Sequence, residues 1–265
     1  MRKKLKKGTV SSIVAPVLFG VFLFVLWQTQ VLHQLFHTDT FTLPLPSRIV
    51  TIIFDNLSKV MINVQATVIV SLCGLILGSL LGYLMAIIAV VFPKGGVGGL
   101  NVVSAFNAIP IVALAPVITN WTKDVSDDAS VRSMIAKILV VMVVCTASMS
   151  VNAYRGLKDV KPFSEDLMKT YAAGKFTTFV KLRFSNSAPY VFTALRVSVP
   201  SSVIGALVSE YFAEYIIGVG RQIRENIVLA QYATAWAYIV VACFIGILMY
   251  AVLMIFESIL LKHRR

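Results

Sequence analysis

Long hydrophobic stretches separated by short polar intervals run along most of this chain. Six stretches are candidates for membrane-spanning helices: residues 10–32, 66–92, 97–121, 135–151, 190–211 and 233–261. A helix needs roughly 17–25 mainly apolar residues to cross the hydrocarbon core of a bilayer. The pattern therefore predicts an all-α polytopic membrane protein with six transmembrane helices, in a single transmembrane domain over residues 1–265.

Two intervals are predicted to lie at the outer surface instead of crossing the membrane. The prolines in LPLPS end any preceding helix, and residues 47–57 then have the pattern of a short amphipathic helix with Arg48, Asp55 and Lys59 on its polar side. Residues 210–231 mix charged and apolar positions. This second interval fits a helix-turn-helix that lies on the outer surface or dips into it.

Composition and charge agree with a membrane protein. Hydrophobic residues make up 58% of the chain, charged residues 14%, and the mean hydropathy is +0.83. Of 24 Lys and Arg, 16 fall in the tail of residues 1–7, at Lys94, in residues 155–183 and in residues 262–265. Six spans place all of these on one side, so the positive-inside rule accounts for the net charge of +12 without a nucleic-acid partner. Both termini are therefore expected in the cytoplasm.

The ends of several stretches carry their own signals. The first stretch is longer than the core of a signal peptide and is followed by no small-residue cleavage site, so an uncleaved span is expected. A turn is predicted at residues 93–96, and the loop of residues 122–132 is expected outside.

Neither the cysteines nor the histidines have the spacing of a disulfide framework or a metal site: Cys73, Cys145, Cys243, His33, His37 and His263.

A glycine repeat marks one face of the second span. Gly74, Gly78 and Gly82 recur every four residues. Small residues at this spacing let a neighbouring helix approach closely, which predicts a packing seam. The alternative is that glycine is simply common in membrane helices.

Prolines interrupt the third stretch. Pro110 and Pro116 lie within NAIPIVALAPVITNW, and a proline removes a backbone donor, so the helix must kink or break there. Irregular backbone at membrane depth is tolerated where it lines protein or a water-filled cavity. These prolines, with Ser201 and Ser202 of the fifth span, are the predicted translocation-pathway residues. A kinked helix with a purely structural role is the alternative.

The polar interval of residues 155–187 is predicted to dock a partner. Apolar residues recur in it at spacings of roughly three to four, so one face of a helix can bind another protein. Small residues expected in mid-helix, at 172–174, would let that protein come close. The apolar positions are Phe163, Leu167, Tyr171, Phe179 and Leu182.

This interval also carries a family resemblance. The segment MKTYAAGKFTTFVKLRFSNSAPYVFTALRVSV resembles the cytoplasmic signature loop of binding-protein-dependent ABC transporter permeases. LPLPSRIV, NVQATVIVSLCGLILGSLLGYLMA, NAIPIVALAPVITNW and EYFAEYIIGVG resemble the branch that imports sulfonates, taurine, nitrate and thiamine precursors. The chain departs from the usual signature at Ala172, where a glycine is usual, and at Phe184-Ser185, where Leu-Pro is usual.

The resemblance implies a type I ABC importer permease fold in a prokaryotic cytoplasmic membrane. It implies two permease copies surrounded by lipid, two ABC ATPase subunits, and an external solute-binding protein. ATPase coupling falls on Leu167, Tyr171, Ala172, Ala173, Gly174, Lys175 and Phe179, and the outer gate or binding-protein contact on Glu210, Gly218 and Gly220. The chain has no Gly-x-x-x-x-Gly-Lys-Ser/Thr loop, so ATP and magnesium are expected on the separate ATPase, with no cofactor or metal on this chain.

Two other classes of protein are alternatives to a permease. A membrane-embedded enzyme would cluster ionisable residues at membrane depth. The predicted spans contain almost none apart from Arg196, Glu210 and Glu257, which argues against an enzyme. An ion-driven secondary carrier or channel stays the alternative. A carrier would show an internal repeat with paired broken helices and an intramembrane carboxylate, and the sequence shows neither clearly. Sulfonates, nitrate-like anions and pyrimidine precursors all remain candidate solutes.

Overall fold

The computed structural model describes residues 7–262, with the side chains of residues 14–262 except that of Asn107. The basic tail before Lys7 and the C-terminal His263, Arg264 and Arg265 lie outside the described residues. Within them the structure is helical and contains no strand, so the all-α prediction is confirmed. The helices are α1 (Lys7–Gln28), α2 (Val31–Leu35), α3 (Pro46–Asp55), α4 (Leu57–Val91), α5 (Pro93–Ala105), α6 (Ile111–Trp121), α7 (Ala129–Lys158), α8 (Ser164–Thr170), α9 (Lys175–Thr178), α10 (Ser185–Phe212), α11 (Val219–Val228) and α12 (Tyr232–Leu260).

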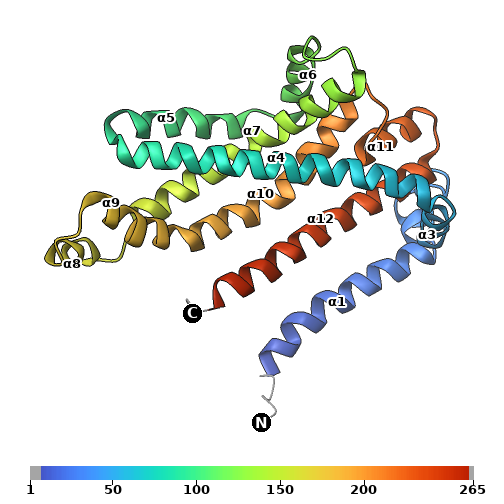
Figure 1. The fold of residues 1–265 in the computed structure, drawn as a ribbon. Helices are drawn as coiled ribbons and strands as arrows, with labels where there is room; N and C mark the ends of the chain where they lie inside the picture. Colours follow the sequence, from blue (N-terminus) through green and yellow to red (C-terminus); the bar gives the residue numbers. More distant parts are fainter. Residues whose placement is uncertain (1–6, 263–265) are drawn as a thin grey trace.

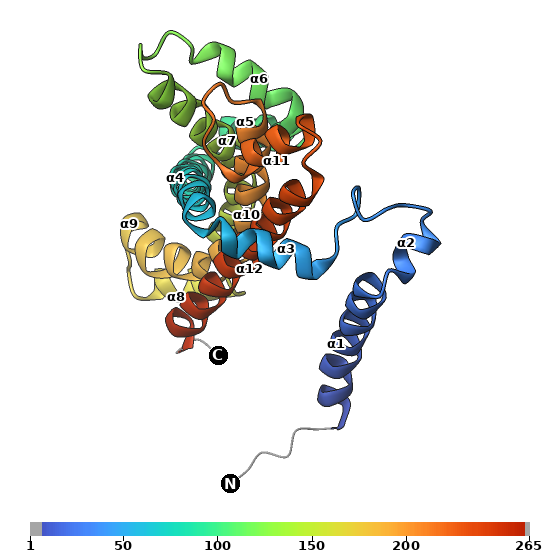
Figure 2. The same ribbon diagram turned by 90° about the vertical axis from the view of Figure 1, so that its right-hand side faces the viewer.

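Four helices form the body of the molecule. α4, α7 and α10 run side by side, and α12 crosses beside α4 and α10 (Figure 1). By length and composition α4, α7, α12 and the continuous helix Lys175–Phe212 are each able to cross a membrane. Most of α1 stands away from this bundle, to which the strap of residues 29–45 joins it (Figure 2); its end touches α12, where Trp27 packs edge-to-face on Trp236. The apolar side chains described on α1 are therefore largely exposed.

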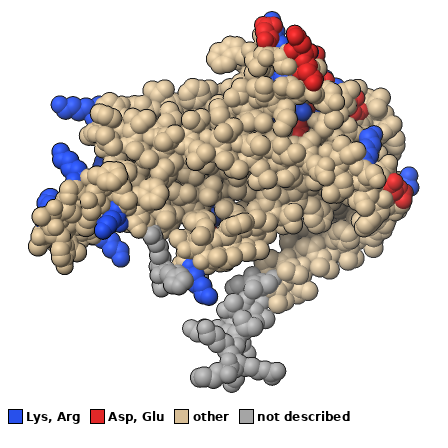
Figure 3. Space-filling view, in the orientation of Figure 1, with Lys and Arg blue, Asp and Glu red and all other residues tan. Residues whose placement is uncertain are grey.

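The charged side chains lie at the two ends of the bundle. Lys and Arg gather at the end formed by α8, α9 and the start of α5, and acidic side chains gather near α6 at the other end (Figure 3). The surface between these ends is almost free of charge in the view shown. This distribution is what a bilayer requires of a protein that crosses it.

The glycines of α4 lie against α7. A Cβ on Gly74 would lie 2.5 Å from Val141 Cγ1, one on Gly78 2.5 Å from the Met142 carbonyl oxygen, and one on Gly82 2.5 Å from that of Thr146. Real Cβ atoms do not approach other atoms this closely. The two helix backbones can touch here only because these positions have no side chain.

Several predicted boundaries were wrong. α4 begins at Leu57, nine residues before the predicted span, and Lys175–Phe212 begins well before residue 190. Hydropathy marks where a helix leaves the hydrocarbon, whereas its backbone hydrogen bonds continue into polar sequence. The predicted turn at residues 93–96 is also wrong: Pro93 opens α5, a position that suits its missing N–H, and the chain reverses at Phe92.

The prolines of the third stretch divide it. α5 passes through a 3₁₀ turn, Phe106–Ala108, and the chain is extended at Ile109 and Pro110 before α6 begins. The predicted interruption at Pro110 is therefore a complete break, because proline cannot donate to the preceding turn. Pro116 is accommodated inside α6.

Arg196 of α10 is paired with Glu257 of α12, so its side chain is not free to extend toward the surface of the membrane. Its Nε donates to Glu257 Oε2 at 2.8 Å, and its Nη2 donates to Glu257 Oε1, joining α10 to α12. Only 11% of the Glu257 side chain is exposed. The pair is a bidentate contact of the strong, geometrically specific kind.

Removing one member of this pair is expected to lower the stability of the protein more than removing both members. Arg196→Leu or Glu257→Leu alone leaves an uncompensated charge against apolar neighbours, whereas the double variant leaves none. Each single variant should lower the melting temperature of the purified protein in detergent, and the double variant should recover part of the loss. Equal melting of all three variants would contradict the pairing.

Candidate functional site

The basic end of the bundle presents large apolar side chains to solvent. Phe163, Tyr171 and Phe176 are 83%, 75% and 80% exposed, and Leu167 is also exposed. They come from α8, the turns beside it and α9, which project from the bundle in Figure 1. We call these four residues the coupling surface. Exposed apolar groups gathered within a polar loop mark a surface that another protein covers.

The loop bearing this surface is tied to α10. Arg183 donates to Glu165 Oε1 at 2.7 Å, which joins the first turn of α8 to the π-helical stretch Phe179–Phe184. Asn186 Nδ2 donates to the carbonyls of Gly156, at 2.8 Å, and Asp159, at 3.1 Å, and so caps the end of α7. A force on α8 can therefore reach both α7 and α10.

The small residues 172–174 are not in mid-helix, which corrects the prediction. α8 ends at Thr170, and the Ala172 and Ala173 amides donate to the Lys169 and Met168 carbonyls, at 2.8 and 3.0 Å. These two bonds form a Schellman motif, in which the residue after the C-cap takes a left-handed conformation. That residue is Ala172, whose φ is +49°. Glycine is suited to that position, so the departure at Ala172 falls where the backbone needs glycine most.

The turn also resets which residues face outward. Phe179 packs against the buried cluster that contains Met149 and Ala153, so it faces the bundle. Phe176, which was not predicted, faces solvent instead. Spacing counted through an assumed continuous helix could not place either residue, because the helical phase restarts after Gly174. Lys175 and Gly174 are exposed at the start of α9.

At the opposite end, a buried carboxylate organises the approach to α11. Glu210 is completely buried, and its Oε2 accepts from the Gly220 amide at 2.8 Å and from the Thr67 hydroxyl at 3.0 Å. The Val219 amide donates to Thr67 Oγ1 at 2.9 Å, and the Gly218 amide donates to Asn63 Oδ1 at 2.9 Å. We call Asn63, Thr67, Glu210, Gly218 and Gly220 the outer network.

Both glycines of the outer network are required by their surroundings. Gly218 has φ +123°, and a Cβ there would lie 2.6 Å from either carboxylate oxygen of Glu210. A Cβ on Gly220 would lie 2.8 Å from the Leu207 carbonyl carbon. The predicted trio therefore lies together, but the Glu210 carboxylate is enclosed by protein and is not presented to an external partner.

Sequence reasoning missed the buried polar residues of α4, of which Thr67 bonds to Glu210 and Asn63 to Gly218. Asn63, Thr67 and Ser71 follow one another at four-residue spacing and are buried on one face of α4. Polar residues at helical spacing within an apolar stretch were the available signal. Lys137 of α7 is also buried nearby, where its ammonium donates to the Ile217 carbonyl at 2.9 Å.

The loop outside this network is held by one ion pair and one hydrogen bond to its backbone. Arg132 Nη2 donates to Glu214 Oε1 at 2.9 Å, and Arg221 donates to the Ala213 carbonyl at 3.1 Å. The Arg132 guanidinium, through its hydrogen bond and its charge, lowers the pKa of the Glu214 carboxyl below its usual value. This surface pair orders residues 213–217 above the buried carboxylate.

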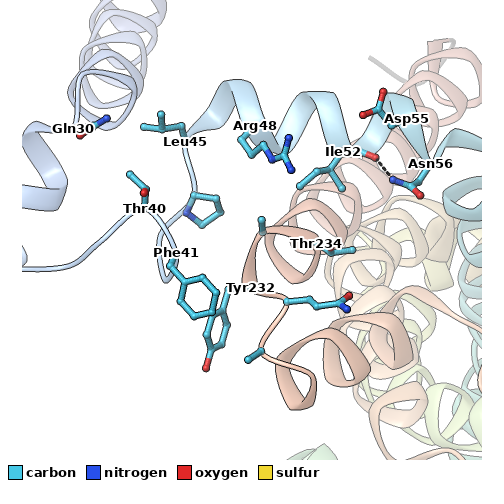
Figure 4. A pocket seen from close by; sticks show the side chains of 14 residues that line it. Gln30, Thr40, Phe41, Leu45, Arg48, Ile52, Asp55, Asn56, Tyr232 and Thr234 are labelled. Carbon is cyan, nitrogen blue, oxygen red and sulfur yellow. Dashed lines mark hydrogen bonds between the residues drawn. The ribbon is translucent and has the colours of Figure 1, made fainter.

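A cavity of about 740 Å³ lies beside this end, between α3, the strap and the start of α12 (Figure 4). The predicted amphipathic helix is present as α3, and Arg48 and Asp55 line the cavity from it. Phe41 of the strap packs edge-to-face on Tyr232, with ring centroids 5.2 Å apart. The strap is thus fixed to α12 although most of α1 stands apart.

The predicted pathway residues are divided by the structure. Ser201 lines a hollow with Ile109, the neighbour of Pro110 at the break before α6. Ser202 is fully buried and does not line this hollow, and its hydroxyl donates to the Val199 carbonyl at 2.8 Å. Pro116 is exposed and does not line this hollow. The structure therefore brings Ser201 and the Pro110 break together and separates Ser202 and Pro116 from them.

Comparison with known proteins agrees with this arrangement. Residues 78–265 match the family model described as the inner membrane component of binding-protein-dependent transport systems. The chain is 28% identical over 253 residues to the formylaminopyrimidine transport permease protein ThiX of Halalkalibacterium halodurans, covering 94% of this chain and 96% of that protein. It is 24% identical over 199 residues to a probable ABC transporter permease protein of Haemophilus influenzae, covering 75% and 77% of the two chains. With its helical, multi-pass architecture, the chain belongs to the family of binding-protein-dependent ABC transporter permeases of the inner membrane.

Proposed function

We propose that this chain is the membrane subunit of an ATP-driven importer, in which two permease copies bind two separate ATPase subunits. An external solute-binding protein delivers the solute, and both chain termini lie in the cytoplasm. The observation that carries this proposal is the coupling surface, which exposes three aromatic rings and Leu167 at the basic end of the bundle. A family member without such a surface would have no place for an ATPase to act on.

The fold provides a route from the ATPase to the solute. Movement of α8 is passed through the Arg183–Glu165 pair to the continuous helix Lys175–Phe212. The same helix carries Ser201 in its middle and Glu210 at its far end. Rocking of this helix as a rigid body would open the pathway alternately to either side, as in other domain-closure transitions.

The solute is proposed to be a small pyrimidine-like compound. The support is the relative from Halalkalibacterium halodurans, whose name assigns it formylaminopyrimidine transport and which aligns over almost the full length of both chains. An ion-driven carrier is the rival function, since Glu210 is a buried intramembrane carboxylate whose Oε1 has no hydrogen-bond partner among the described residues. Uptake that persists with a protonophore and stops without ATP would favour the importer.

We expect Gly174→Glu to uncouple transport without disturbing the fold. No atom lies within 4 Å of a Cβ built on Gly174, so the new carboxylate has room but sits beside the coupling surface. In proteoliposomes containing the permease, its ATPase and its binding protein, uptake should fall at least about ten-fold, equivalent to about 1.4 kcal/mol of coupling. The matched control is Gly95→Glu, because Gly95 is equally open and lies in α5 near the same end. Equal loss in both variants would remove the special role of residue 174.

A further inference from the structure

A hollow of about 380 Å³ lies at the break between α5 and α6. Its walls include Phe106 and Ile109 from the break, Ser148 from α7, and Val197, Ser201 and Ile204 from α10. This volume is at the small end of the range of roughly 300–1,000 Å³ seen for small-molecule sites. The extended backbone at Ile109 and Pro110 forms one rim, so irregular backbone here borders a cavity.

The described lining is uncharged. Its polar side chains are the hydroxyls of Ser148 and Ser201, and the rest of the lining is aliphatic apart from the Phe106 ring. Arg196, which directly precedes the lining residue Val197 on α10, is ion-paired with Glu257 of α12. A charged solute would therefore lose its hydration without gaining a counter-charge, which is strongly unfavourable. A flat neutral solute could stack on Phe106 and bond to the two hydroxyls.

The hollow lies on a continuous face of α10. Val197, Ser201, Ile204, Val208 and Tyr211 recur at three- to four-residue spacing, so they follow one side of the helix. The last two line a second, apolar hollow of about 320 Å³ together with Val112 from the first turn of α6. Two hollows therefore follow one helix face, with the start of α6 between them.

We propose that the hollow at Phe106, Ser148 and Ser201 is a solute-binding site within the translocation pathway, selective for neutral, planar heteroaromatic compounds over anions. Phe106 supplies a stacking face, and the Ser148 hydroxyl bonds to a ring nitrogen or an amino group. The Ser201 hydroxyl donates to the Val197 carbonyl at 2.9 Å, so its oxygen accepts from an amino group of the solute. This inference rests on the proposed transport function and adds the class of solute that the membrane subunit itself accepts. The external binding protein then selects among compounds that the hollow already admits.

The test compares two adjacent serines. In a background lacking Cys73 and Cys243 and retaining the fully buried Cys145, Ser201→Cys and Ser202→Cys are each purified with the ATPase subunits and treated with N-ethylmaleimide. We expect Ser201→Cys to react at least about ten-fold faster, because the Ser202 side chain is fully buried and is not part of the lining of the hollow. Size-exclusion chromatography before labelling restricts the comparison to folded complexes.

Protection by added solute identifies the class. Formylaminopyrimidine, at a mildly alkaline pH that keeps it neutral, should slow modification of Ser201→Cys several-fold, and methanesulfonate should not. Phe106→Leu should abolish this protection and Phe106→Tyr should keep it, since only the tyrosine preserves a stacking ring. Equal protection by both probes, protection by neither, or no reaction at Ser201→Cys would each overturn the proposal.

Failure of the proposed transport function would look different. ATP-dependent uptake is measured separately on the unlabelled complex with all native cysteines. Uptake that does not depend on ATP would reject the importer while the labelling result still stands. ATP-dependent uptake combined with an unprotected Ser201→Cys would reject the site while the importer stands.

Discussion

Replacing Gly78 by leucine is expected to leave no folded protein in the membrane, whereas the same change at Gly246 is expected to be tolerated. A Cβ on Gly78 would already lie 2.5 Å from the Met142 carbonyl oxygen and 2.8 Å from Cys145 Cβ. Both neighbours belong to α7, and one of them is backbone, so relief requires α4 and α7 to separate. Gly246 lies in α12 with no atom within 4 Å of its Cβ position.

The expected size follows from overpacking. Even Gly78→Ala should cost about 1–3 kcal/mol, and the branched leucine side chain should exceed this. With a total stability of roughly 5–15 kcal/mol, a disrupted central helix pair is enough to prevent folding. Fluorescence-detected size-exclusion of tagged variants in mild detergent measures the folded fraction. A normal, monodisperse peak for Gly78→Leu would show that the α4–α7 seam is not close-packed.

Removing the Glu210 carboxylate is expected to abolish uptake by releasing α11. In Glu210→Ala the Gly220 amide loses its acceptor in a site closed to water, and the Thr67 hydroxyl keeps only the Asn63 carbonyl, at 3.1 Å. Each buried polar group left unpaired costs roughly 1–3 kcal/mol. That cost falls on the short connection between α10 and α11, so we expect local release before global unfolding.

Graded variants separate this structural role from ion coupling. Glu210→Gln keeps an acceptor oxygen for both donors, so it should retain most uptake if Glu210 positions α11, and should be as inactive as alanine if its ionisation drives transport. Glu214→Ala is the matched control, because it removes an exposed carboxylate four residues on together with its surface pair to Arg132, and it should lower uptake far less than Glu210→Ala. Hydrogen exchange at residues 218–222 should accelerate in Glu210→Ala alone. Loss of activity in Glu210→Gln would favour the ion-driven carrier.

Much of the architecture was predictable because each signal was local. The prolines and the drop in hydropathy at LPLPS predicted α3, and the prolines of the third stretch predicted the break at Pro110. The distribution of Lys and Arg predicted the basic end of the bundle. The coupling interval was found by its polarity within an apolar chain. Its internal geometry was not, because the turn at Ala172 interrupts the helical phase on which the choice of Phe179 depended.

The sequence by itself therefore determined the class of protein, the number and order of apolar stretches, and the family, since hydropathy, proline and charge act on neighbouring residues. Only the tertiary structure decided what each polar residue in a span is for. Thr67 and Glu210 are 143 residues apart, and Arg196 and Glu257 are 61 apart. Such pairs form because buried polar groups must find partners wherever the packed helices bring them, and the distance along the chain does not reveal which partner that is.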